Sequence, residues 1–318
     1  MDRREQVQYL NQALLAEMPQ YREQAESFPA DEISQRRLLR SLMNVRPPMP
    51  LAPEFLEVQD ALLSTEREEK GVVDGDALPP TAGDPRLILW QRTSRLRADA
   101  IVDADNSACW CFAPCHGCID NASHSAGGLQ LRDACADILR AQGHPEPAGR
   151  ATLTRAYNLP ARYVLHTVGP IVGRWVSWKD RRELASCYRS CLELAAEHDL
   201  RSVAFCCIST GEFHFPNQEA AEIAVRTVRE FLEQQTTSVE RVIFNFSKTW
   251  TQPSTAVSSD PIEQLKGALA SADAVVVRAG RVVRLCGMTY SGERFRRYFS
   301  DFQSGTTSGH VLRRILSL

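Results

Sequence analysis

The chain has 318 residues, and its 37 lysines and arginines against 39 aspartates and glutamates give a formal net charge of −2. That balance excludes a strongly basic binder of nucleic acid or of acidic membranes. Hydrophobic residues make up 43% of the chain, as in globular proteins, and its apolar runs are far shorter than the roughly 20 residues of a membrane helix. The first residues show no signal-peptide pattern, so we expect a cytoplasmic protein with no nucleic-acid partner and no membrane contact.

The first eighty residues have the patterns of helices. Their apolar spacing predicts helices over residues 5–24, 31–44 and 53–70, the last of which ends before Gly71. We therefore expect residues 1–80 to form a helical N-terminal extension.

From residue 86 onward, short apolar strands alternate with amphipathic helices, which is typical of an α/β fold. Strands are predicted at 87–91, 100–103, 152–157, 163–168, 202–208 and 241–246. Helices are predicted at 119–141, 177–198 and 217–235. One sheet layered by helices accounts for residues 81–255, and the polar stretch 254–259 is expected to be a linker.

The ten cysteines fall into two groups. Six lie in periodic apolar segments and are expected to fill the core, because a free cysteine packs as a small hydrophobe: Cys135, Cys187, Cys191, Cys206, Cys207 and Cys286. The other four lie within ten residues that also contain His116, between a predicted strand and a long helix: Cys109, Cys111, Cys115 and Cys118. This second group is the candidate for chemistry.

Three functions compete for the cysteine and histidine cluster. Zinc is favoured, because three or four mixed ligands in one loop can hold the ion, and three would leave a position open for water or substrate. A redox role would use Cys115 and Cys118 ahead of a helix N-terminus. A nucleobase deaminase is excluded, because its H-x-E motif must lie upstream and His116 is the first histidine of the chain.

Longer motifs resemble the zinc-dependent macrodomains, which remove ADP-ribose from proteins. The first is CFAPCHGCIDNASHS at residues 111–125, followed by QLR at 130–132. The others are HTVGP at 166–170, AFCCISTGEFHFP at 204–216, and LLRSLMNVRPP at 38–48 in the helical extension. The resemblance implies a macrodomain-like three-layer α/β/α fold with a mixed sheet, and an ADP-ribose cleft at the strand ends.

The resemblance also implies the residues of the site. Cys111, His116 and Cys118 would bind Zn²⁺, with Cys109 and Cys115 as neighbours that could substitute as ligands but are not expected to. Asp120 would orient the distal ribose or the attacking water, and Asn106 would bond a ribose hydroxyl. The residues expected to bind substrate are Asn121, Ser209, Thr210, Gly211, Glu212 and Phe213, because backbone N–H groups of a loop between a strand and a helix can hold a diphosphate.

Each of these residues also has a purely structural interpretation. Asp120 and Asn106 are typical of helix caps and turns, the loop at 209–213 is typical of a tight turn, and His124 is better explained as a packed core histidine than as a fourth ligand. Some positions depart from the family pattern. Asp103 and Asp105 add negative charge near an anionic ligand if they face the cleft.

Residues 256–318 resemble the opening of a sirtuin, with a predicted strand at 274–277 and the segment 290–302. Only Gly280 remains of the three glycines in the sirtuin nucleotide loop, so we expect a degenerate fragment without activity. A sirtuin fragment beside a macrodomain fits a reversible ADP-ribosylation system, with a sirtuin-type ADP-ribosyltransferase as a partner.

The prediction is therefore a zinc-dependent hydrolase that removes ADP-ribose from mono-ADP-ribosylated proteins. Its partners would be those proteins and free ADP-ribose. The alternative is a module that binds ADP-ribose or a related nucleotide without hydrolysing it, the zinc being structural.

Overall fold

The computed structural model describes residues 1–81, 83–91, 95–109, 113–234 and 236–246, together with the short antiparallel strands β9 (Val283–Leu285) and β10 (Met288–Tyr290). Cys111, Cys286, the linker predicted at 254–259 and the strand predicted at 274–277 lie outside the described residues. No helix in the described part of the chain combines the length and apolar character needed to cross a membrane.

The extension consists of helices, as predicted: α1 (Arg3–Glu17), η1 (Pro19–Tyr21), α2 (Arg22–Glu26), α3 (Glu32–Val45) and α4 (Pro53–Lys70). Asp2 and Glu5 form a capping box at the start of α1. The single helix predicted over 5–24 is interrupted at Pro19, which has no backbone N–H and cannot continue the hydrogen-bond ladder of α1. Gly71 ends α4 with a φ of +73°, a conformation that favours glycine.

The central sheet has the strand order β2 (Leu87–Gln91), β8 (Arg241–Phe246), β7 (Ser202–Phe205), β4 (Ala100–Asp105), β6 (Tyr163–Val168) and β5 (Ala151–Arg155). All neighbours are parallel except β5, which is antiparallel to β6. The sheet is mixed, as predicted. A separate parallel pair is formed by β1 (Val73–Asp74) and β3 (Leu96–Arg97), with η2 (Gly75–Ala77) after β1.

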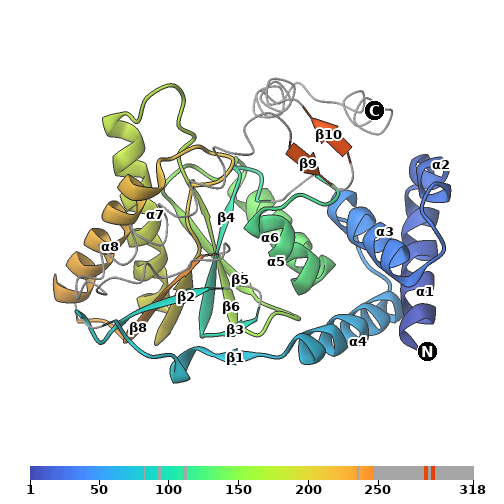
Figure 1. Ribbon diagram of the computed structural model, residues 1–318, viewed down its shortest axis with the longest axis horizontal. Helices are drawn as coiled ribbons and strands as arrows, with labels where there is room; N and C mark the ends of the chain where they lie inside the picture. Colours follow the sequence, from blue (N-terminus) through green and yellow to red (C-terminus); the bar gives the residue numbers. More distant parts are fainter. Residues whose placement is uncertain are drawn as a thin grey trace, which may run out of the picture.

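Helices cover both faces of the sheet (Figure 1). On one face lie α7 (Trp178–Glu197) and α8 (Asn217–Gln234), and on the other lie α5 (Ile119–Gly127) and α6 (Leu129–Gln142). The extension packs outside α5, mainly through α3 and α4. The three-layer α/β/α arrangement with a preceding helical extension is therefore confirmed.

Several boundaries differ from the prediction: the strands expected over 100–103 and 152–157 extend over Ala100–Asp105 and Ala151–Arg155, and two further differences have a clear physical reason. The helix expected over 119–141 is split at Gly128, whose φ is +95° and where a Cβ atom would lie 2.7 Å from the Gln59 amide nitrogen. The strand expected over 202–208 ends at Phe205, because the chain turns there and Ser209 adopts a left-handed φ of +63°.

The parallel strands β4, β6 and β7 end at one edge of the sheet, so the loops that follow them meet there. The described residues of these loops are 106–109, 113–118, 169–177 and 206–216. This edge is where the expected site residues gather.

Candidate functional site

The loop before α5 carries two of the expected zinc ligands. His116 is buried, and its Nε2 lies 3.3 Å from Oε1 of Glu212. Cys118 is the N-cap of α5, and its Sγ accepts a hydrogen bond from the backbone N–H of Asn121 at 3.4 Å. A helix N-terminus favours negative charge, which suits a thiolate ligand. With Cys111 outside the described residues, the complete ligand set stays a prediction.

Arg40 of α3 connects this loop to the helical extension. Its Nη2 donates to the backbone carbonyl of His116 at 3.1 Å, and its Nε donates to Oδ1 of Asn121 at 2.9 Å. The Asn121 Nδ2 in turn donates to the carbonyl of Ala113 at 2.8 Å. Asn121, which was expected to bind substrate, is thus fully buried and ties the loop to α3 and α5.

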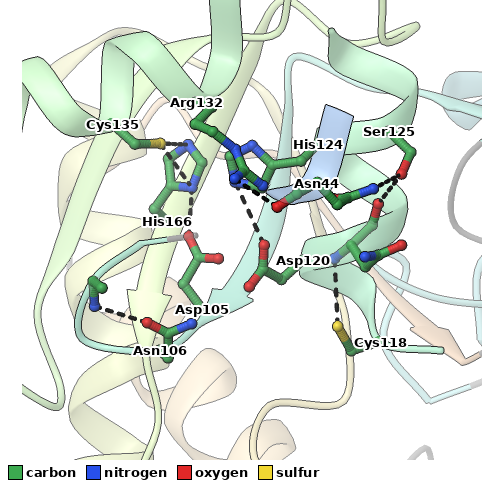
Figure 2. A network of polar contacts seen from close by, with 12 residues as sticks. Asn44, Asp105, Asn106, Cys118, Asp120, His124, Ser125, Arg132, Cys135 and His166 are labelled. Atoms are coloured by element: carbon green, nitrogen blue, oxygen red, sulfur yellow. Dashed lines mark hydrogen bonds and ion pairs between the residues drawn. The ribbon is translucent and has the colours of Figure 1, made fainter. Parts of the chain in front are cut away.

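Asp120 and His124 lie one turn apart on α5, and both are buried (Figure 2). The His124 Nε2 is 3.4 Å from Oδ1 of Asp120. Burial, followed by the charges of Arg132 and His166, lowers the pKa of His124 well below its usual value, so its ring is neutral. The expectation that His124 is a packed interior histidine is consistent with its burial.

Asp103 and Asp105 alternate along β4 and point toward the layer of α5. Both side chains are buried and do not face an open cleft. The repulsion of an anionic ligand that was expected if they faced the cleft therefore does not apply. The Nδ1 of His166 donates to Oδ2 of Asp105 at 2.7 Å. Burial alone would lower the pKa of His166, but the hydrogen bond and charge of Asp105 outweigh it and raise that pKa.

Asn106 and Cys109 form a turn at the end of β4. The Asn106 side-chain Oδ1 accepts the N–H of Ala108 at 2.8 Å, and its backbone carbonyl accepts the N–H of Cys109 at 2.9 Å. The turn role foreseen for Asn106 is therefore present. Burial raises the pKa of the Cys109 thiol, which disfavours the thiolate that a metal ligand must be.

The loop at 206–216 holds the other expected substrate-binding residues. Ser209 is buried, and a Cβ atom on Gly169 would lie 2.0 Å from its Oγ, so the loops after β6 and β7 approach closely only because residue 169 is glycine. The Phe213 carbonyl accepts the N–H of Val172 at 2.8 Å. Thr210 bonds the Cys207 carbonyl through its Oγ1 at 3.0 Å.

Gly211 is exposed at the tip of this loop, and a Cβ atom there would meet nothing within 4 Å, so the tip is open to a ligand. The Glu212 carboxylate is directed to His116, and that hydrogen bond lowers the pKa of Glu212. The structure thus connects a substrate-binding candidate directly to a metal-binding candidate.

Sequence reasoning missed the roles of Arg40, Asp103, Asp105 and His166. The Asp-x-Asp spacing on a buried strand was one available signal, since alternate strand residues share a face. The four-residue spacing of Asp120 and His124 was another, since it places two side chains on one face of a helix. Arg40 had no local signal, because its partners lie more than seventy residues away.

Comparison with known proteins matches residues 102–224 to the Macro domain model. The chain is 46% identical over 249 residues to the Protein-ADP-ribose hydrolase of Treponema medium, a match covering 77% of this chain and 94% of that protein. It is 38% identical to a probable bifunctional ADP-ribose hydrolase/ADP-ribosyltransferase of Fusarium oxysporum f. sp. cubense, covering 82% of this chain and 50% of that protein.

Among solved structures, the Trypanosoma brucei macrodomain in complex with ADP-ribose is 28% identical, with a TM-score of 0.52 over 72% of this chain and 93% of that one. The mixed sheet between helical layers agrees with this similarity. From the Treponema match across nearly the whole relative and the Macro match over 102–224, the chain belongs to the macro domain family.

Proposed function

We propose that this protein removes ADP-ribose from mono-ADP-ribosylated proteins by zinc-dependent hydrolysis of the N- or O-glycosidic bond to the protein side chain. The observation that carries the proposal is the 46% identity to a Protein-ADP-ribose hydrolase over 94% of that relative. The loops gathered at the carboxyl edge of the sheet support it, because ligands of open α/β sheets bind at this edge.

Cys111, His116 and Cys118 would hold the zinc. Two thiolates and one imidazole are a donor set that zinc prefers, and three protein ligands leave one position for substrate. When bound, zinc supplies a Lewis acid that polarises an oxygen of the distal ribose. Arg40 fixes the backbone of His116 through its carbonyl, so it acts as a positioning residue for this loop.

In the hydrolysis, a water oxygen bonds to the anomeric carbon of the distal ribose while the bond to the protein side chain breaks. The proton from the water passes to the leaving side chain, and ADP-ribose is released. Asp120 would accept a hydrogen bond from this water or from a ribose hydroxyl and so orient it.

The remaining contacts to ADP-ribose would come from two loops. Ser209, Thr210, Gly211 and Glu212 would hold the diphosphate. The exposed position of Gly211 and the contact of Glu212 with His116 support this assignment. Phe213 would pack against a ribose, Asn106 would bond a ribose hydroxyl, and Asn121 would support the site from the first turn of α5.

A sirtuin-type ADP-ribosyltransferase is proposed as the partner that produces the modified protein. The support is the sirtuin-like sequence at 256–318 and the similarity to a fungal protein whose name couples hydrolase and ADP-ribosyltransferase.

The test measures release of free ADP-ribose from a mono-ADP-ribosylated protein, with chelator and with zinc added back. Release should stop on chelation and return with zinc. Cys118→Ser should lower turnover by about 100-fold or more. Loss of a residue that only hydrogen-bonds to a metal ligand already lowers metal affinity or activity by about 10–100-fold, and Cys118 would be a ligand itself. Cys115→Ser is the matched control, three residues away in the same loop, and should keep most activity.

Folded, zinc-containing protein that binds ADP-ribose but releases none from any linkage would contradict the hydrolase and establish the binding module instead. Unfolding of Cys118→Ser would assign the zinc to structure rather than to catalysis.

A further inference from the structure

A second cluster of potential metal ligands lies where β4 meets α5, separate from the thiolates of the loop. Asp103 and Asp105 come from β4, and Asp120 and His124 from α5. One ligand atom from each of the four side chains lies within 4.8 Å of all the others. Their exposed fractions are 0%, 1%, 4% and 3% respectively, so the cluster is buried. Figure 2 shows Asp105, Asp120 and His124.

The cluster carries more negative than positive charge. Three carboxylates lie away from water, where an ionised group is costly unless it is paired. The Nδ1 of His166 donates a hydrogen bond to Oδ2 of Asp105 at 2.7 Å. The neighbouring Arg132 guanidinium donates to the backbone carbonyls of Asn44 and Arg46 at 2.7 and 3.1 Å. A cation held by these carboxylates would offset part of their charge.

Lone pairs within the cluster point to a ligand independently of charge. Oδ1 of Asp105 has no hydrogen-bond partner among the described residues, although Asp105 is almost fully buried. Neither ring nitrogen of His124 makes a hydrogen bond within the described part of the chain; Nε2 has only the 3.4 Å contact to Asp120. Buried polar atoms are nearly always satisfied, so these atoms call for an unseen partner.

We propose that Asp103, Asp105, Asp120 and His124 bind a divalent cation of the class that prefers oxygen ligands. Mn²⁺ is the member of this class that fits the four side chains best. A separation of 4.8 Å is the span of opposite ligands around a cation at about 2.4 Å, so all four atoms can reach one ion. Three carboxylate oxygens favour Mn²⁺ and Mg²⁺ over thiophilic ions, and the imidazole favours Mn²⁺ over Mg²⁺. The cation stabilises the β4–α5 contact by balancing its charge.

The test uses the full chain. The protein is unfolded, stripped of metal, and refolded with one equivalent of zinc in the presence of Mn²⁺. Refolding is needed because a buried site exchanges metal slowly in the folded protein. Electron paramagnetic resonance counts bound Mn²⁺ without a signal from zinc. We expect the wild-type chain to bind about one Mn²⁺. Asp103→Asn and Asp105→Asn should each bind Mn²⁺ at least about 10-fold more weakly than the wild type. Asp137→Asn, an exposed aspartate on α6, is the matched control and should bind as the wild type does.

Thermal unfolding gives a second readout. Mn²⁺ should raise the unfolding temperature of the wild type and of Asp137→Asn but not of Asp103→Asn. Without metal, Asp103→Asn should unfold at the same or a higher temperature, because it removes a buried charge. Cys118→Ser should still bind Mn²⁺, which separates this site from the proposed zinc site.

Two results would overturn the proposal. One is the absence of Mn²⁺ binding by the folded wild-type chain. The other is equal binding by wild type, Asp103→Asn and Asp105→Asn. A loss of stability in Asp103→Asn that is the same with and without Mn²⁺ would also overturn it, since the carboxylate would then serve only as a structural hydrogen-bond acceptor.

Discussion

The two faces of the central sheet differ in what they bury. Under α7 and α8 the buried side chains are mostly apolar, including Leu184, Cys187, Cys191, Phe205 and Val228. Under α5 and α6 the same sheet buries a second apolar cluster, which includes Ile101, Leu131 and Val164, and beside it a group of ionisable side chains: Asp103, Asp105, Asp120, His124 and His166. Alternate residues of β4 serve the two faces, since Val102 joins the apolar cluster and its neighbour Asp103 joins the acidic one. Both faces therefore contribute apolar packing, but only the α5 face adds a cluster of ionisable groups whose burial is costly unless they are paired or bind a ligand.

The apolar face should be the more sensitive to loss of volume. Phe205 is fully buried, and its ring centroid lies 4.9 Å from that of Tyr188 and 6.4 Å from that of Phe244. Phe205→Ala should lower the free energy of unfolding by about 3–5 kcal/mol, measured by urea denaturation. Phe205→Leu, which keeps most of the volume, should cost less than about 1.5 kcal/mol. Equal effects of the two changes would contradict a tightly packed face.

The polar face should respond to loss of a single hydrogen-bonding group. Arg40→Ala should cost about 1.5–3 kcal/mol of unfolding free energy, because it removes charged hydrogen bonds to His116 and Asn121. It should also slow ADP-ribose release. Arg40→Lys keeps the charge but not the forked geometry, so it should recover little of the activity. Arg4→Ala, an exposed arginine of α1, is the control. Full activity in stable Arg40→Ala would remove the positioning role.

A pH effect should arise at the opposite edge of the sheet, away from the site. Burial alone would raise the pKa of Asp99, but hydrogen bonds from the N–H groups of Arg201 and Ser202, together with Arg162, lower it below its usual value. A lowered pKa stabilises the fold above the unfolded value of 3.8, and this stabilisation is lost as pH falls through the folded pKa. Asp99→Asn should therefore lose less unfolding free energy than the wild type between neutral pH and about pH 3.

The control for this pH series is Asp137→Asn, whose carboxylate is exposed. It should follow the wild-type curve. A wild-type curve that stays flat below pH 4, or one that Asp99→Asn reproduces, would show that the Asp99 hydrogen bonds do not favour its charged form.

The smallest effect should come from a charge pair on the outside of the apolar face. Arg189 of α7 and Glu230 of α8 approach to 3.8 Å, and both side chains are about half exposed. Glu230→Gln should change the unfolding free energy by less than about 0.5 kcal/mol, because water and salt screen exposed pairs. If Glu230→Gln lowered the unfolding free energy as much as Arg40→Ala, exposed and buried charged groups would contribute equally to stability, and the comparison of the two faces would fail.

Most of the fold could be predicted from local patterns. The strands Tyr163–Val168 and Arg241–Phe246 and the helix Pro53–Lys70 have the bounds that the sequence predicts, because their apolar periods and flanking residues are clear. The break at Gly128 was not predicted, since glycine within an apolar helical pattern does not reveal the contact with Gln59 that requires it.

The site was less accessible to prediction. The loop candidates at 116–121 and 209–213 do meet at one edge of the sheet, as their motifs imply. The pairing of Asp105 with His166 depends on the register of β4 against β6, and the contacts of Arg40 depend on how the extension docks. Neither is encoded in short-range spacing.

The docking of the extension also limits how far the chain can be divided. Gln59 of α4 accepts the N–H of Leu129 and bonds Gln130, while Leu129 packs among the buried side chains of α1, α3 and α4. A fragment beginning at residue 81 would uncover this apolar surface and release the loop that Arg40 holds. The macro domain of this protein is therefore not a portable module, and transferring its chemistry to another scaffold would require transferring the N-terminal helices with it.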